Sequence, residues 1–403
     1  MLRKVSLFFL VLALIFSGIT AYAVWKDALP LVSPIALVEV IIGNSAASKS
    51  PKVIYGFFPY WNSKYADELN INLLTHFAYF AVDLNPDGSI NKANSKREQE
   101  PGWNKLNSKT VGKLLYQSKL LDQKTVLTIT AMDTDLIDSI LSNPQNFDNA
   151  IKSIIDVYHQ YDFDDINIDF EYIGEPNEKI RGGFVAFIQS LKNACLGINK
   201  YCQIDIDVFG DAATKYRLWD LNSLNQTVDH VIVMAYDYYR KSSSQAGPVA
   251  PLTGKCQTKN NNLCLEQDIM FHISEMTKIV SPEKIILGIP FYGYEWQTAG
   301  EDFLANTYPG TGSMASYSRI QTIFSDPDVS SLSAKWSEST LSPYLVFEID
   351  KEIHQIHFEN PESIKQKIKL IKSAGLGGIA IWALGYETPF PDLWNPIKSL
   401  TTL

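Results

Sequence analysis

The chain has 403 residues, of which 46% are hydrophobic and 12% aromatic, and its formal net charge is −9. This length suffices for one large domain or two ordinary ones, and the hydrophobic fraction allows a sizeable core. An acidic chain without a basic run argues against nucleic-acid binding, so no nucleic-acid partner is expected. The aromatic content suits a protein that stacks on sugar rings, although most of these rings are expected in the core.

The N-terminus has the features of an export signal. Arg3 and Lys4 precede an uncharged run over residues 5–25, and Ala21-Tyr22-Ala23 forms a small-x-small cleavage site. Residues 1–25 are therefore predicted to be a secretory signal peptide. The run is also close to the roughly 20 residues that span a bilayer, so an uncleaved membrane anchor stays open as the alternative. In both cases the protein is expected to be secreted or extracytoplasmic, and residues 26–51 are predicted to be a linker.

Four cysteines fit an exported protein with disulfide bonds. Local pairing of Cys195 with Cys202 and of Cys256 with Cys264 is the simplest of three connectivities. A zinc site is the weaker alternative, because the spacing lacks CxxC pairs and no histidine lies beside these cysteines. The sequence predicts neither a metal site nor a cofactor.

From residue 52 onward, short β-branched or aromatic runs alternate with helical patterns. Eight runs are predicted to be strands: 53–58, 76–82, 125–130, 166–170, 203–209, 230–236, 284–291 and 377–382. The helical patterns cover residues 111–121, 147–161, 183–194, 265–279 and 363–375. Eight such units predict an α/β fold, a (β/α)8 TIM barrel over residues 52–403. An open doubly wound sheet is the weaker alternative, since no GxGxxG follows the first strand.

The segment between the seventh and eighth strands is too long for a single helical connection. It contains LVFEI at 345–349 and HQIHF at 354–358, which predict a hairpin that turns at residues 350–352. Residues 293–358 are therefore predicted to form a small inserted α+β subdomain. Loops at the strand C-termini build the active site of such barrels, so the insertion can wall a groove there.

The fourth strand places polar groups at regular spacing in an apolar run. Side chains alternate along a strand, so Ile166, Ile168 and Phe170 are expected to face the helices. Asn167, Asp169 and Glu171 then point into the barrel, with Glu171 at its mouth. Neighbouring carboxyls share protons and raise one pKa, which makes Glu171 the natural proton donor. The alternatives are a satisfied polar core layer and a metal site.

This stretch, in order Asp164, Asp165, Ile166, Asn167, Ile168, Asp169, Phe170 and Glu171, resembles the signature of glycoside hydrolase family 18, the chitinase family. Four further segments resemble family motifs in the same order: 233–239, 246–252, 284–296 and 375–387. The resemblance extends over residues 52–395, and an insertion in the seventh loop is common in this family. It implies a glycoside hydrolase domain over residues 52–403.

The resemblance also implies a retaining, substrate-assisted reaction on β-1,4-linked N-acetylglucosamine polymers such as chitin or peptidoglycan. Glu171 would protonate the leaving oxygen, Asp169 would contact the acetamido nitrogen, and Tyr236 would donate to the acetamido carbonyl. Trp382 would be the floor under the reacting sugar. The remaining residues expected at the substrate are Asn167, Asp237, Tyr292, Phe57, Trp61 and Trp296.

Four departures from the family pattern occur in this chain. Asp165 replaces a glycine, Asn167 replaces a frequent aspartate, Phe57 replaces a common tyrosine, and TITAMD at 128–133 replaces the motif of the third strand. None of them changes Glu171, Asp169 or Tyr236, so activity is expected. A non-catalytic chitinase-like sugar-binding protein and an ordinary two-carboxylate glycosidase are the rival hypotheses.

Overall fold

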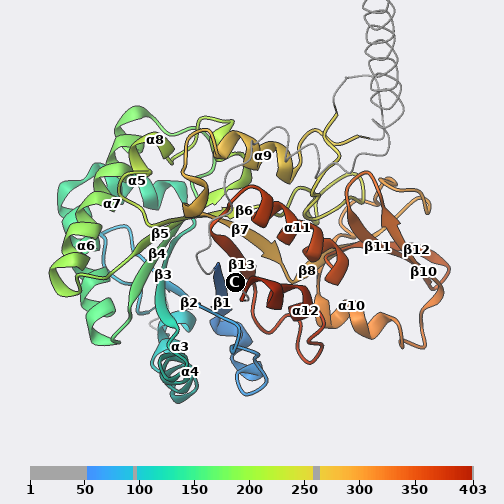
Figure 1. Ribbon diagram of the computed structural model, residues 1–403, viewed down its shortest axis with the longest axis horizontal. Helices are drawn as coiled ribbons and strands as arrows, with labels where there is room; N and C mark the ends of the chain where they lie inside the picture. The colour runs from blue at the N-terminus through green and yellow to red at the C-terminus, as the bar shows by residue number, and fades with distance from the viewer. Residues whose placement is uncertain (1–51, 94–97, 257–263, 402–403) are drawn as a thin grey trace, which may run out of the picture.

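The computed structural model describes residues 52–93, 98–256 and 264–401, and eight parallel strands in it close into a barrel (Figure 1). The strands are β1 (Val53–Pro59), β2 (His76–Asp83), β3 (Lys124–Ala131), β4 (Asp165–Phe170), β5 (Ile204–Phe209), β6 (His230–Met234), β7 (Ile285–Pro290) and β13 (Gly378–Trp382). Pairing of Val53 with Gly378 joins the first strand to the last and closes the sheet. The predicted (β/α)8 fold is confirmed.

Helices cover the outside of the barrel (Figure 1). They are α3 (Pro101–Leu106), α4 (Lys109–Leu120), α5 (Thr134–Ser142), α6 (Pro144–Gln160), α7 (Glu178–Ile198), α8 (Leu221–Leu224), α9 (Ile269–Met276), α11 (Pro361–Ser373) and α12 (Trp394–Ile397). Capping residues determine where several of these helices begin and end. Asn360 and Ser363 form a reciprocal capping box at the start of α11, and Gly375 follows its end with a φ of 69°.

The helix predicted over residues 265–279 is shorter in the structure. It begins only after Asp268, whose carboxylate accepts a hydrogen bond from the backbone N–H of Phe271 at 2.8 Å. An aspartate in this position satisfies the free N–H groups of the first turn, so it defines the start of α9. The preceding residues instead form a loop that contains Cys264.

The two faces of β4 separate as predicted. Ile166, Ile168 and Phe170 are fully buried between the barrel and its helices. A second, smaller apolar cluster fills the barrel interior and includes Tyr55, Phe57, Phe80, Val126, Ile232 and Ile286. The polar residues of β4 lie on this inner face.

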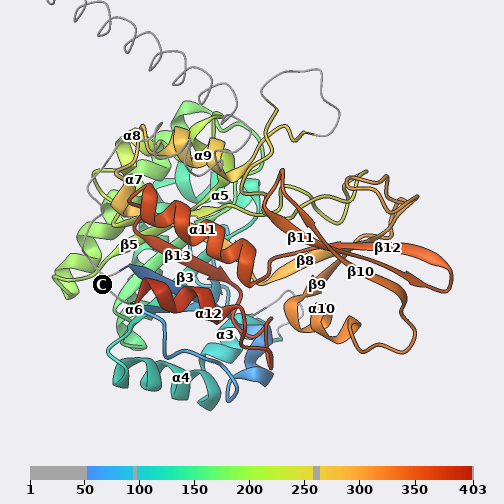
Figure 2. The same ribbon diagram turned by 45° about the vertical axis from the view of Figure 1, so that its right-hand side comes forward.

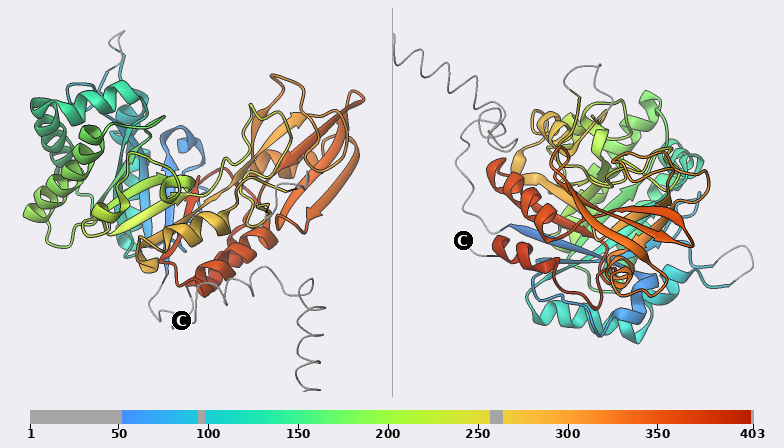
Figure 3. Two further views of the ribbon diagram at one scale, coloured as in Figure 1. Left: turned by 90° about the horizontal axis from the view of Figure 1, so that it is seen from above. Right: turned by 90° about the vertical axis from the view of Figure 1, so that its right-hand side faces the viewer.

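A five-stranded antiparallel sheet lies beside the barrel (Figure 2). Its strands are β8 (Tyr292–Gln297), β9 (Ser313–Ser316), β10 (Ser330–Ser337), β11 (Ser342–Ile349) and β12 (Glu352–His357), in the order β10-β11-β12-β8-β9, with α10 (Tyr317–Ile323) after β9. The predicted hairpin is β11–β12, which turns at Asp350 and Lys351 with φ values of 54° and 70°. Seen from above, the sheet forms a wing next to the barrel mouth (Figure 3).

Two disulfide bonds join Cys195 to Cys202 and Cys256 to Cys264, with Cα–Cα distances of 6.1 and 5.0 Å. The predicted local pairing is confirmed. Among the residues that the structure describes, no helix is long and apolar enough to cross a membrane. The predicted signal peptide or anchor at 1–25 and the linker at 26–51 lie outside the described residues.

A polar cluster occupies the barrel interior near the N-terminal ends of the strands. The Nδ1 atom of His230 lies 2.9 Å from Asp205 Oδ1, and the ring of His76 stacks on Tyr55 with centroids 5.2 Å apart. Asp165, which replaces the family's glycine, is fully buried beside them. One of its oxygens accepts from the Gln203 N–H at 2.7 Å, and the other has no partner in the described chain.

The buried Asp165 should make stability pH-dependent. Burial, and then the charge of Asp205, raises the pKa of Asp165 from 3.8 to about 7. The pKa of Asp165 is higher in the folded than in the unfolded protein. Its contribution to the free energy of unfolding is therefore fully present below about pH 4 and is lost as the pH rises through 7. The side chain of Asp165→Asn stays neutral at every pH. We therefore expect the free energy of unfolding of this variant, relative to that of the wild type, to rise by about 2–3 kcal/mol from pH 5 to pH 8. Urea denaturation at both pH values measures this difference.

Asp162→Asn is the matched control, because the Asp162 side chain is 91% exposed and lies only three residues away. Its free energy of unfolding should follow that of the wild type within about 0.5 kcal/mol at both pH values. A pH-independent difference between Asp165→Asn and the wild type would contradict the burial argument.

Candidate active site

The three polar residues predicted on the fourth strand lie inside the barrel and at its mouth. Asn167 and Asp169 are 0% and 3% exposed inside the barrel, and Glu171 follows the last strand residue. The backbone N–H of Glu171 donates to the Ala131 carbonyl at 2.9 Å, which continues the pairing of β3 with β4 beyond the strand end. The Glu171 carboxyl is thus held at the mouth, and it makes no hydrogen bond or ion pair within the described residues.

A third carboxyl, Asp207 on β5, completes the buried acidic group. Asn167 Nδ2 donates to Asp207 Oδ1 at 3.1 Å, and Asp207 is 3% exposed. The sequence analysis missed Asp207. The signal was available, since the alternation in IDIDVF at 204–209 turns Asp205 and Asp207 toward the same interior as Asp169.

Burial and mutual repulsion keep protons in this group. Burial, followed by the charges of Asp207 and Glu171, raises the pKa of Asp169 well above its usual range. Burial also raises the pKa of Asp207. Burial raises the pKa of Glu171, the Arg240 guanidinium opposes that rise, and Asp237 adds to it. The site therefore retains a protonated carboxyl at a pH where exposed carboxyls are ionised.

Asp237 is fixed by two phenols from β8. The Tyr292 hydroxyl donates to Asp237 Oδ1, and the Tyr294 hydroxyl donates to the same oxygen at 3.0 Å. Asp237 has a φ of 61°, a conformation that costs energy for any residue with a Cβ and that these two bonds help to hold. Tyr294 was not predicted, although it follows Tyr292 at the period-two spacing of a strand. With both phenols donating to it, Asp237 is not a free carboxylate.

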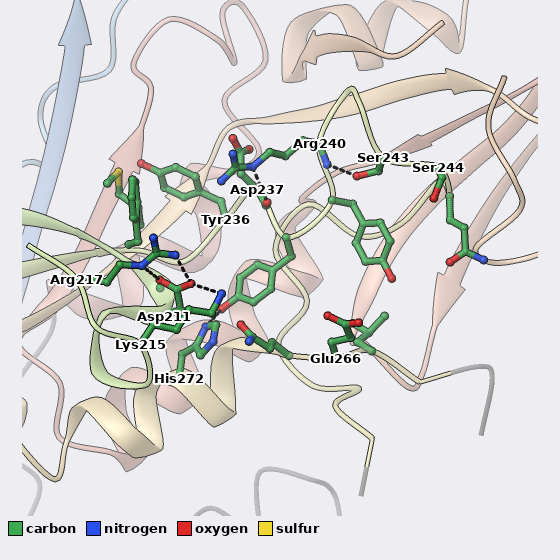
Figure 4. A pocket seen from close by; sticks show the side chains of 18 of the residues that line it. Asp211, Lys215, Arg217, Tyr236, Asp237, Arg240, Ser243, Ser244, Glu266 and His272 are labelled. Carbon is green, nitrogen blue, oxygen red and sulfur yellow. Dashed lines mark hydrogen bonds and ion pairs between the residues drawn. The ribbon is translucent and has the colours of Figure 1, made fainter. Parts of the chain in front are cut away.

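Tyr236 lies next to Asp237 after the end of β6. Its ring packs edge-on against Tyr292 with centroids 6.2 Å apart. Its hydroxyl makes no hydrogen bond within the described residues, and the side chain lines the cavity above β4. Tyr236 and Glu171 thus present an uncommitted donor and an uncommitted carboxyl to the same space (Figure 4 labels Tyr236).

Trp382, at the end of β13, stands among three other rings. The centroid distances from Trp382 are 4.6 Å to Phe80, 6.0 Å to Phe57 and 6.2 Å to Trp61, all in edge-to-face geometry. Trp61 is 43% exposed, and its indole N–H donates to the Tyr386 hydroxyl at 3.3 Å. Rings held edge-on in this way leave flat aromatic faces of the kind that suit a sugar.

The structure contradicts one predicted substrate contact, Trp296, and places two others, Asn167 and Phe57, deeper than the sequence predicts. Trp296 is 0% exposed within the inserted sheet. It shares the face of β8 that carries Tyr292 and Tyr294, but it lies further along the strand, where it packs against Tyr294 and His357. Asn167 is fully buried and bonded to Asp207, so it supports the carboxyl group from beneath. Phe57 is 4% exposed and supports Trp382 from inside the barrel.

A cavity of about 890 Å³ opens beside Glu171 (Figure 4). Its lining comes from the segments that follow β4, β5 and β6, from residues 264–272, and from Leu304 of the insertion. Besides Glu171, Tyr236 and Asp237, it includes the charged residues Asp211, Lys215, Arg217, Arg240 and Glu266. In the described ranges, no group of three or more His, Cys, Asp or Glu side chains has an arrangement that could hold a metal ion.

Comparison with known proteins identifies the family of this chain. Residues 53–387 match the family "Glycosyl hydrolases family 18". "Probable di-N-acetylchitobiase 1" of Dictyostelium discoideum is 25% identical over 60% of this chain and 67% of its own length. The "Cortical fragment-lytic enzyme" of Bacillus anthracis is 22% identical over 80% of this chain and 67% of its own length.

Comparison with solved structures finds the same fold. The structure of the Ostrinia furnacalis Group IV chitinase superposes with a TM-score of 0.71 at 18% identity, covering 87% of this chain and 97% of the chitinase. The chain spans about two thirds of the length of the sequence relatives. Since the family match covers 53–387, most of the 403 residues, this protein belongs to glycosyl hydrolase family 18 and is a glycoside hydrolase.

Proposed function

We propose that this protein is an exported hydrolase of β-1,4-linked polymers that contain N-acetylglucosamine, and that it acts with retention through substrate assistance. The observation that carries this proposal is the pairing of an uncommitted Glu171 carboxyl with the buried Asp169 beneath it and the free Tyr236 hydroxyl beside it. Export rests on the sequence of residues 1–25 alone.

Among the described residues that line the cavity directly after β4 and β6, Glu171 is the one free carboxyl, where an ordinary retaining glycosidase needs two. Such an enzyme places an acid and a nucleophile about 5–5.5 Å apart on opposite sides of the bond. Asp169 is 3% exposed and lies on the same strand as Glu171, and Asp237 accepts hydrogen bonds from Tyr292 and Tyr294. The nucleophile is therefore assigned to the 2-acetamido group of the substrate.

The proposed reaction has two steps. First, Glu171 gives its proton to the glycosidic oxygen while the acetamido carbonyl oxygen attacks the anomeric carbon, and the glycosidic C–O bond breaks. Asp169 accepts from the acetamido N–H, and Tyr236 donates to the carbonyl oxygen. Second, ionised Glu171 takes a proton from water, which attacks the anomeric carbon and reopens the oxazolinium ring. The two inversions at the anomeric carbon give net retention. Because its pKa is raised, Glu171 still holds the proton that it gives up in the first step.

Two polymers fit this chemistry. One relative is named for di-N-acetylchitobiose cleavage and another for lysis of cortical fragments, which support chitin-type and peptidoglycan-type substrates respectively. Both carry the acetamido group that the mechanism needs. Trp382 and Trp61 are proposed to stack on the sugar rings, since both present aromatic faces next to the mouth.

Removal of the proton donor should abolish turnover. Glu171→Gln keeps the shape of the side chain but has no proton to give, so we expect kcat on chitin oligomers to fall by roughly 10²–10⁴-fold. Binding of the same oligomers, measured calorimetrically, should persist. Glu175→Gln is the matched control, because Glu175 is exposed on the next loop and does not line the cavity.

Wild-type binding of chitin oligomers and peptidoglycan strands without cleavage of either would reject the hydrolase and favour the sugar-binding rival. Equal activity of Glu171→Gln and the wild type would reject the role of Glu171 alone.

The acetamido group should be essential. We expect the wild type to cleave 4-nitrophenyl glycosides of N-acetylated oligomers but not the glucosyl equivalents, because only the former carry the internal nucleophile. Tyr236→Phe removes the donor to the acetamido oxygen, and we expect it to lower kcat by about 10²-fold. Nitrophenol release measures both effects, and Tyr116→Phe on the exposed surface of α4 is the control. Efficient cleavage of the glucosyl substrate would instead favour the two-carboxylate mechanism.

A further inference from the structure

The cavity beside Glu171 brings three cations together with four carboxyls. The whole protein has a formal charge of −9, yet three cations line this one cavity: Lys215, Arg217 and Arg240. They come from two different segments, one after β5 and one after β6. Figure 4 shows the two groups on different parts of the wall.

The group after β5 consists of Asp211, Lys215 and Arg217. Arg217 binds Asp211 through two hydrogen bonds, from Nε at 3.0 Å and from Nη2 at 2.7 Å. Lys215 lies 2.9 Å from the same carboxylate. One acid thus serves two cations, and the group has a formal surplus of one positive charge.

Arg240 differs from Lys215 and Arg217 because it has no carboxylate partner among the described residues. Its backbone N–H donates to the Ser243 hydroxyl at 2.9 Å, and its Nε donates to the Asp237 carbonyl at 3.2 Å. These bonds orient the side chain, but no carboxylate of the described residues pairs with its guanidinium. Its Nη donors remain available, and they form the flat fork that suits a carboxylate.

Acidic groups that face the same cavity do not neutralise Arg240. Asp237 is bonded by the hydroxyls of Tyr292 and Tyr294, and Asp211 is shared by its own two cations. Glu171 must carry a proton to act as the acid. Glu266 is exposed and belongs to the segment after Cys264, where no ion pair joins it to Arg240. An unpaired guanidinium thus lies close enough to Glu171 to influence its pKa.

We propose that Arg240, assisted by the Asp211–Lys215–Arg217 group, recognises a carboxylate attached to the sugar units of the substrate. The protein would then prefer acidic N-acetylated chains, such as those in which alternate sugars carry a 3-O-lactyl group, over neutral chitin. A substituent fixed to the ring lies within a few bonds of the scissile oxygen, and Arg240 lies near Glu171. This inference rests on the proposed function and names the substrate class within it.

The test compares matched substrates that differ in one charge. Peptidoglycan glycan strands stripped of peptides retain the lactyl carboxylate, and amidation of that carboxylate with ammonia gives the neutral counterpart. For the wild type we expect kcat/KM to be about tenfold higher on the carboxylate strands, and added salt should reduce this preference. Reducing-end release measures both rates at one pH.

Arg240→Gln should remove most of the preference, lowering the ratio of the two kcat/KM values by about tenfold. Arg240 also acts on the pKa of Glu171, so the variant should show an alkaline limb shifted to higher pH. That shift changes activity on both strands alike and cancels in the ratio. Lys241→Gln is the matched control, since Lys241 is an exposed neighbouring cation that does not line the cavity, and its ratio should equal that of the wild type.

Each outcome separates this inference from the proposed function. Equal rates on carboxylate and amidated strands, or an unchanged ratio in Arg240→Gln, would overturn the carboxylate recognition while leaving the hydrolase intact. If only strands that still carry peptides showed the preference, the recognised carboxylates would belong to the peptide, and the inference would fail. Absence of cleavage on every N-acetylated chain would instead reject the proposed function.

Discussion

The site depends on the removal of carboxyl groups from water inside a closed barrel. Asp169 and Asp207 are each 3% exposed and lie on adjacent strands, and the neutral Asn167 donates a hydrogen bond to Asp207. An ionised carboxylate without a counter-ion is costly in such surroundings, so the group keeps protons. Glu171 lies at the upper end of the same group, and it can therefore stay protonated where an exposed glutamate would be ionised.

The surrounding polar groups divide the carboxyls by role. Tyr292 and Tyr294 occupy one oxygen of Asp237, which removes this residue as a free nucleophile and holds its left-handed backbone. Arg240 acts in the opposite direction on Glu171 and limits the rise of its pKa. Glu171, the buried Asp169 beneath it and the Tyr236 hydroxyl beside it form the set that the proposed substrate-assisted reaction requires.

The inserted sheet does more than form a wall beside the site, because it also supplies two side chains to the site. Its first strand, β8, follows β7 after a single residue, and alternation along β8 sends Tyr292 and Tyr294 toward Asp237. Trp296 continues the strand into the core of the insertion, where it packs on His357. One strand thus joins the two parts of the fold, and its pairing with β9 holds the two phenols in register.

The sequence by itself determined the barrel, the hairpin of the insertion and the alignment of Asp169 with Glu171, because these follow from local periodicity and chain order. It also indicated the local disulfides, since short loops allow few pairings. The tertiary structure alone decided which groups meet from different strands: Asp207 under Asn167, Tyr294 on Asp237, and Arg240 near Glu171. It also decided that Trp296 and Phe57 are buried. The alternation of side chains along a strand predicts which face of the strand a residue occupies. Only barrel closure and the packing of the insertion determine what lies on that face.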